Sequence, residues 1–184
     1  MWRKLLSLCL AAALPLSLGA CQGGDWLDLQ LFCDGYNDLA GKNAVSLTPE
    51  SFQAARREDG GARYQAWMGE TKLLVLDTLP NGRIHTISLT GLPDEGKTGE
   101  DFMSAARLVA ASYTRSAPWL AVRRLHAVEA GTAELPGWRI AEEGGFRFSY
   151  SANQAGRYLR ISQLRYLAEE EVPTLRANDA QPLG

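Results

Sequence analysis

The spacing of apolar residues changes along the chain, and each spacing predicts a kind of element. Apolar positions three and four apart predict an amphipathic helix over residues 26–40 and a second one after Asp101. The faces of these two helices comprise Leu29, Phe32, Cys33, Tyr36 and Leu39, and Phe102, Ala105, Ala106, Val109 and Tyr113. Two shorter helices, at residues 49–57 and 116–130, are predicted where Pro49 and Pro118 stand at the first helical positions.

Six further segments are rich in β-branched and aromatic residues and predict strands. They cover residues 62–68, 71–78, 83–90, 138–142, 146–152 and 157–166. The connections are short and contain glycine, as in Pro80-Asn81-Gly82, which predicts antiparallel neighbours. The expected fold class is therefore α+β, with an antiparallel sheet of about six strands and helices packed on one face.

The predicted elements follow the same order twice: a long helix, a shorter helix that begins with proline, and three strands. Phe32 and Phe102 are 70 residues apart, and Pro49 and Pro118 are 69 apart. This order is consistent with two ααβββ halves related by pseudo-symmetry, although the halves share little sequence, and a true duplication stays open. Residues 25–167 are expected to form a single domain, and the polar residues 168–184 a disordered tail.

Alternation along the predicted strands separates an apolar face from a polar one. Phe146, Phe148 and Tyr150 share a face, as do Leu159 and Ile161. If these residues face the helices, the opposite side of the sheet carries a candidate binding set of residue types that are frequent at interface hot spots. The set comprises Arg63, Trp67, Arg147, Tyr158 and Arg160. The competing interpretation is an ordinary solvated sheet face.

The N-terminus has the pattern of an export signal. Arg3 and Lys4 precede an apolar stretch that is too short for a permanent membrane span, and Leu18-Gly19-Ala20-Cys21 follows. Leu18 is too bulky for the A-x-A-like site of an ordinary secretory signal. The segment resembles a bacterial lipoprotein signal peptide with its lipobox, and the resemblance covers residues 1–21.

The resemblance implies that residues 1–20 are removed and that Cys21 receives lipid, with residues 21–24 as a short tether. Two or more acyl chains anchor a protein stably. Gln22 stands where an Asp commonly retains lipoproteins in the inner membrane, so in a Gram-negative host the resemblance implies the outer membrane, facing the periplasm. Plain secretion is the alternative. No family resemblance is seen in the mature domain.

Charge and cysteine content narrow the function classes. Without residues 1–20, 17 basic residues stand against 21 acidic ones, a formal charge of −4, which argues against nucleic acid as a partner. If Cys9 leaves with the signal and Cys21 is lipidated, as the resemblance implies, Cys33 is expected to be a lone thiol in an oxidising compartment. Its place on an apolar helix face favours a buried, unreactive cysteine.

No catalytic or metal-binding constellation is evident. His85 and His126 have no second ligand at metal spacing, so neither a metal nor a cofactor is expected. Residues 91–98 match the phosphate-loop pattern G-x-x-x-x-G-K-[ST] letter for letter. Nucleotide binding is rejected because Pro93 removes an N–H donor and because Asp94 and Glu95 would place negative charge in an anion cradle.

These observations predict a lipid-anchored, non-catalytic binding module of the cell envelope that engages an envelope or periplasmic protein. A narrower version is an immunity-type inhibitor of a periplasmic toxin. The alternatives are an envelope hydrolase with a site assembled from distant residues and a structural assembly factor of an envelope complex. A deep pocket lined by His85 or His126 with a carboxylate partner would favour the hydrolase, whereas a flat sheet face would count against it.

Overall fold

The computed structural model describes residues 27–41, 44–92, 100–130, 133–135, 138–153 and 155–167. The signal peptide, the lipidation of Cys21, the tether and the C-terminal tail are predictions that fall outside these residues. Residue range 93–99, which holds most of the segment that matches the phosphate-loop pattern, also lies outside them.

The described residues form one antiparallel sheet in the order β1-β2-β3-β4-β8-β7-β6-β5. The eight strands are β1 Gln53–Arg56, β2 Ala62–Trp67, β3 Lys72–Thr78, β4 Ile84–Gly91, β5 Ala133–Leu135, β6 Trp138–Glu143, β7 Phe146–Asn153 and β8 Gly156–Gln163. The α-helices are α1 Leu29–Leu39, α2 Glu100–Thr114 and α3 Pro118–Ala130, and two short 3₁₀ helices are η1 Pro49–Ser51 and η2 Leu164–Tyr166. The fold is α+β.

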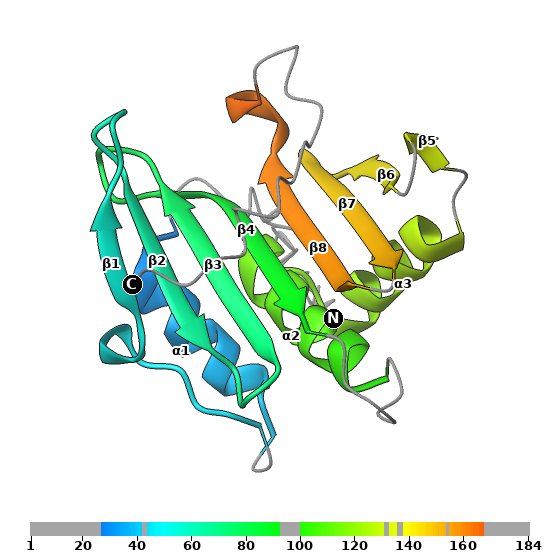
Figure 1. The fold of residues 1–184 in the computed structure, drawn as a ribbon, viewed down its shortest axis with the longest axis horizontal. Coiled ribbons are helices and arrows are strands. Elements are labelled where there is room, and N and C mark those ends of the chain that lie inside the picture. The colour runs from blue at the N-terminus through cyan, green and yellow to red at the C-terminus, as the bar shows by residue number, and fades with distance from the viewer. Residues whose placement is uncertain are drawn as a thin grey trace, which may run out of the picture.

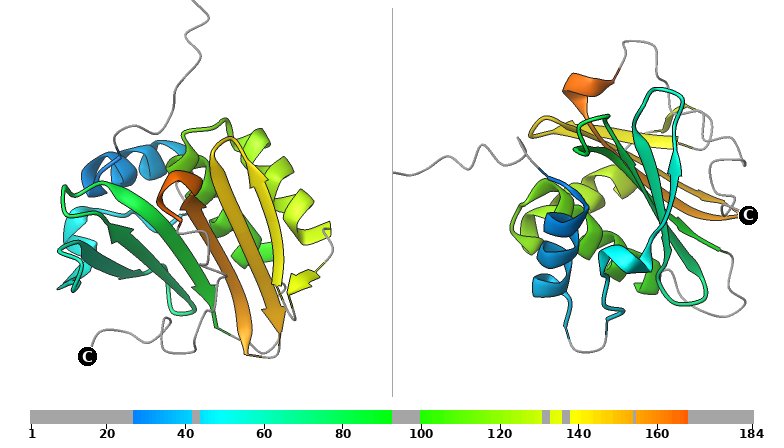
Figure 2. Two further views of the ribbon diagram at one scale, coloured as in Figure 1. Left: turned by 90° about the horizontal axis from the view of Figure 1, so that it is seen from above. Right: turned by 90° about the vertical axis from the view of Figure 1, so that its left-hand side faces the viewer.

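All three α-helices lie on one side of the sheet, behind it in the view of Figure 1. The two further views in Figure 2 show the same two layers, with the helices on one side only. α1 contacts α2, and α2 and α3 contact β4, β8, β7 and β6. The core lies between these layers. As predicted, it includes Phe32, Cys33 and Tyr36 of α1 together with the apolar positions of α2.

Local signals explain where the main elements begin and meet. The Asp28 side chain caps α1 by accepting a hydrogen bond from the Leu31 amide at 2.9 Å. Gly91 ends β4, and a Cβ atom there would lie 2.6 Å from the Phe102 ring of α2. The first glycine of the phosphate-loop pattern is therefore needed for close packing between sheet and helix.

The observed elements differ from the predicted ones in three places. The helix predicted at 49–57 ends at Ser51, and residues 53–56 form β1 because they pair with Ala62–Gln65 of β2. The strand predicted at 157–166 ends at Gln163 and continues as η2. β5 was not predicted, and with β1 it extends the sheet from the expected six strands to eight. In each case tertiary pairing outweighs the local sequence signal.

None of the helices in the described residues has the length and apolar character needed to cross a bilayer.

Candidate binding face

The strand register places all five candidate residues on the side of the sheet that faces away from the helices. This side is called the sheet face below. Residues of the opposite parity, such as Ala66, Leu74 and Ile87, belong to the core. On β2, β7 and β8 the candidate residues alternate with these core positions, as the sequence pattern predicts. The candidate residues are Arg63, Trp67, Arg147, Tyr158 and Arg160.

The sheet face is organised in three cross-strand rows. One end of the face holds the row Trp67, Leu73, Thr90, Tyr158 and Ser151. The middle row is Gln65, Val75, Ser88, Arg160 and Ser149. The other end holds Arg63, Asp77, Thr86, Ser162 and Arg147. The aromatic residues of the candidate set therefore lie at one end of the face and two of its arginines at the other.

Exposure differs sharply between positions of the sheet face. Trp67 is 44% exposed and is the large hydrophobic residue that this face presents to solvent on β2. Its register partner Leu73 is 1% exposed. The exposed indole is a large apolar area that contact with another surface would remove from water.

Asp77 is the charged residue at the centre of the arginine end. Its side chain is 8% exposed and lies within salt-bridge distance of Arg63 at 2.8 Å and Arg57 at 3.2 Å. Burial alone would raise the pKa of Asp77, but the hydrogen bond and charge of Arg63, with the charge of Arg57, hold that pKa below its usual value. Asp77 is therefore an ionised carboxylate that fixes two guanidinium groups on the sheet face.

Arg147 is held in a similar way at the opposite edge of the same end. Its Nη2 atom lies 2.6 Å from Oε1 of Glu142, and its Nε atom donates to the same oxygen at 2.7 Å. The Glu142 side chain is 46% exposed, so this pair is less buried than Arg63 and Asp77. Two of the predicted arginines are thus fixed in orientation by carboxylates of neighbouring strands.

His85 lies beside the arginine end because the β3–β4 pairing shifts register between Asp77 and Thr78. Its Nδ1 atom is 3.1 Å from the Thr86 hydroxyl, which donates to Ser162 at 3.1 Å. Burial lowers the pKa of His85, the charge of Asp77 raises it, and the charges of Arg57 and Arg160 lower it further. The net shift is downward. The imidazole is therefore neutral near pH 7.

His85 and Asp77 do not form the relay that nucleophilic catalysis requires. In such a relay a carboxylate orients the imidazole, which in turn accepts the proton of the nucleophile. Here the hydrogen bond of His85 goes to Thr86, and the Asp77 carboxylate is engaged by arginines. His126 is exposed on α3, so it lies in the helical layer and not on the sheet face.

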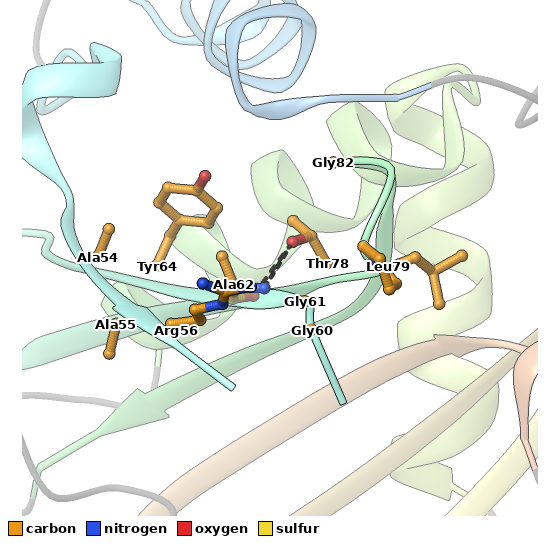
Figure 3. A pocket seen from close by; sticks show the side chains of 11 residues that line it. Ala54, Ala55, Arg56, Gly60, Gly61, Ala62, Tyr64, Thr78, Leu79 and Gly82 are labelled. Carbon is orange, nitrogen blue, oxygen red and sulfur yellow. Dashed lines mark hydrogen bonds between the residues drawn. The ribbon is translucent and has the colours of Figure 1, made fainter. Parts of the chain in front are cut away.

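A pocket of about 390 Å³ lies at the corner of the sheet beside the β1–β2 and β3–β4 turns. Figure 3 shows its lining, in which Tyr64 is the largest side chain and the Thr78 hydroxyl is bonded to Ala62. The lining residues are Ala54, Ala55, Arg56, Gly60, Gly61, Ala62, Tyr64, Thr78, Leu79, Pro80 and Gly82. Neither histidine belongs to it, and Arg56 is its one ionisable side chain besides the tyrosine. This pocket does not supply the acid and base of a hydrolase.

The described residues contain no group of three or more His, Cys, Asp or Glu side chains that could hold a metal ion. Cys33 is buried, and burial together with the charges of Asp34 and Glu50 raises its pKa to about 11. A thiol in this environment stays protonated at physiological pH and reacts slowly.

Neither the place of Asp77 at this site nor its closeness to His85 was predicted from the sequence. A signal was present in the run Lys72-Leu73-Leu74-Val75-Leu76-Asp77, where an acid interrupts a buried strand. A carboxylate in such a position needs a cationic partner. That partner could not be chosen from the sequence, since Arg63 lies 14 residues away and becomes adjacent only through the β2–β3 register.

No protein-family model, no curated protein sequence and no solved structure matches this chain. The class that the geometry defines is an α+β protein with one helical layer and a polar, arginine-bearing sheet face.

Proposed function

We propose that the protein is a lipid-anchored lipoprotein of the bacterial envelope whose sheet face binds another protein. The observation that carries the proposal is the gathering of Arg63, Trp67, Arg147, Tyr158 and Arg160 on the helix-free side of one sheet. Tryptophan, tyrosine and arginine are enriched among the few residues that dominate the binding energy of protein interfaces.

The arrangement of the arginines supports binding rather than catalysis. Arg63 and Arg147 are held by carboxylates of neighbouring strands, so little side-chain entropy remains to be lost on binding. These side chains present guanidinium groups to a partner, which favours an acidic contact surface. If the protein is an immunity-type inhibitor, its net charge of −4 would suit a basic toxin. The arginines of the sheet face would then contact acidic groups on that toxin.

The anchor explains how such a face would reach its partner. Lipidation at Cys21 would hold the domain near the membrane through a tether of a few residues, with Gln22 directing it to the outer membrane. We expect Cys21→Ser to move the protein from the membrane fraction to the soluble fraction and to abolish labelling by an alkynyl fatty acid. A membrane-bound Cys21→Ser protein would contradict the anchor.

The binding proposal is tested by affinity capture of the lipidated protein from detergent-solubilised membranes. The Trp67→Ala/Arg160→Glu double variant should lose a partner that the wild type retains. The matched control is Leu31→Ala/Arg139→Glu, which changes an exposed leucine of α1 and an exposed arginine of β6 outside the sheet face. Equal recovery of every captured protein by both variants would overturn the proposal.

An envelope hydrolase with a site assembled from distant residues is the second candidate, although His85 forms no relay with Asp77 and neither histidine lines the pocket. It predicts that the purified chain hydrolyses an ester, peptide or glycan probe and that His85→Ala removes this activity. A structural assembly factor is the third candidate. It predicts that deletion damages an envelope complex whose subunits are captured with the protein.

We also propose that the two halves of the domain are related by a pseudo-two-fold axis between β4 and β8. The strand order supports it, since β1 to β4 are mirrored in order by β5 to β8 around the antiparallel β4–β8 pair. Each half begins with helical segments and ends with its central strand. An experimental structure in which a rotation fails to superpose the four strands of the halves would overturn this relationship.

A further inference from the structure

Several residues of the sheet face are buried although the helical layer lies on the other side. They include Leu73, in the row of Trp67, and Gln65 and Val75, in the middle row. Leu73, Val75 and Gln65 are 1%, 4% and 5% exposed, values typical of the core. No helix or strand among the described residues covers them in the views of Figures 1 and 2. The solvated face of an antiparallel sheet normally carries polar residues, so buried apolar residues on it indicate that a further segment covers them.

The described chain ends at the edge of this face. η2 follows β8 directly, and its Tyr166 hydroxyl accepts a hydrogen bond from Arg83 at 2.8 Å. The Tyr166 ring also packs edge-on against His85 with centroids 6.3 Å apart. Residues 168–184 therefore start beside the arginine end of the sheet face.

The charges of the two parts are complementary. The segment 168–184 carries Glu169, Glu170, Glu171 and Asp179 against the single base Arg176. The arginine end of the sheet face holds Arg57, Arg63 and Arg147, which pair with Asp59, Asp77 and Glu142, and Arg160 in the next row adds a further positive charge. The acidic run comes two residues after Leu167, so it can reach these arginines without a long connection.

The length of the segment is sufficient to cross the face. Its 17 residues span up to about 55 Å when extended, at roughly 3.3 Å per residue. A strand of eight residues such as β8 covers about 27 Å at the same rise. The segment also contains Val172 and Leu175, which can cover apolar side chains of the middle row.

We propose that residues 168–184 occupy the sheet face of their own chain, with Glu169–Glu171 at the arginine end and the following residues over Leu73 and Val75. This inference deepens the proposed function, because an external partner would have to displace the segment. A tethered segment of this length competes at an effective concentration of the order of millimolar, so its removal should tighten partner binding.

The proposal can be tested without any partner. The mature chain carrying Cys21→Ser and Thr174→Cys is labelled with a nitroxide at position 174, while the buried Cys33 stays unmodified. Paramagnetic broadening of the backbone amide signals is then measured by NMR, and the same sample with the nitroxide reduced is the diamagnetic reference. We expect strong broadening in β2, β3 and β4, and little in α3.

Charge variants complete the test. Neutralising the run with Glu169→Gln, Glu170→Gln and Glu171→Gln should weaken the broadening, as should Arg160→Glu, whereas Arg139→Glu should leave it unchanged. Absence of broadening over β3, or broadening that the glutamine variant does not reduce, would overturn the proposal. Neither result decides whether a partner is captured, so failure of this inference and failure of the binding function remain distinguishable.

Discussion

Arg63 on β2 donates two hydrogen bonds to the Asp77 carboxylate on β3, from Nε to Oδ1 at 2.8 Å and from Nη2 to Oδ2 at 2.9 Å. This bidentate pair connects two strands on the sheet face and fixes the direction of one of the proposed binding residues. Because Arg57 reaches the same carboxylate, the arginine end of the face depends on one acid.

Asp77→Ala should destabilise the fold by about 1–3 kcal/mol, because it removes the buried carboxylate that Arg63 and Arg57 share. The free energy of unfolding in urea measures this loss. The control is Glu142→Ala, which breaks the more exposed pair with Arg147 and should cost less than about 1 kcal/mol. Equal losses in the two variants would contradict the central place given to Asp77.

Stability should fall as the pH drops below the ordinary pKa of histidine, 6.5, because the pKa of His85 is lowered in the folded state. In that range the unfolded chain binds a proton that the folded chain resists. The loss should level off once the pH passes below the folded pKa. Above the ordinary pKa both states are neutral and His85 contributes no pH dependence.

Urea unfolding at pH 7.5 and pH 5.5 checks this, with His85→Gln as the comparison. The difference in unfolding free energy between the two pH values should be smaller in the variant. Asp77 does not confuse the measurement, because the stability it provides is lost only as the pH falls through its own lowered pKa, below 3.8. An unchanged pH dependence in His85→Gln would show that another group is responsible.

Gly61→Ala should be strongly destabilising, by about 2 kcal/mol or more, because its Cβ atom would lie 2.0 Å from the Thr78 carbonyl oxygen. The backbone of both residues 61–62 and Thr78 must move, because the Ala62 amide also donates a hydrogen bond to the Thr78 hydroxyl. The matched control is Gly35→Ala within α1, where a Cβ meets nothing within 4 Å and helix propensity should improve stability by roughly 0.5–1 kcal/mol. Thermal unfolding of both variants gives the comparison.

Cys33 should react with a thiol reagent only after unfolding. The side chain is 1% exposed and its pKa is raised to about 11, so both access and thiolate content are low at pH 8. The Cys21→Ser protein isolates this thiol, and the rate of modification is followed with and without denaturant. Rapid modification of the native protein would place Cys33 outside the core.

Much of the fold could be predicted from the periodicity of apolar residues, because their spacing along a helix or strand reflects which side chains are buried. Phe32, Cys33 and Tyr36 were placed on one buried helix face, and the structure confirms it. The shared face of Arg63 and Trp67 also followed from alternation along one strand. These are relationships within one element, where backbone geometry alone decides which side chains lie together.

What the sequence determined by itself is therefore the α+β class, the course of most elements and the polar side of each strand. Only the tertiary structure decided that residues 53–56 are an edge strand and that Asp77 and His85 join the arginine end of the sheet face. The physical reason is that strand pairing is set by contacts between distant segments. From the sequence alone, Asp77 could pair with any arginine of the chain. Only the register of β2 and β3 places Arg63 next to Asp77.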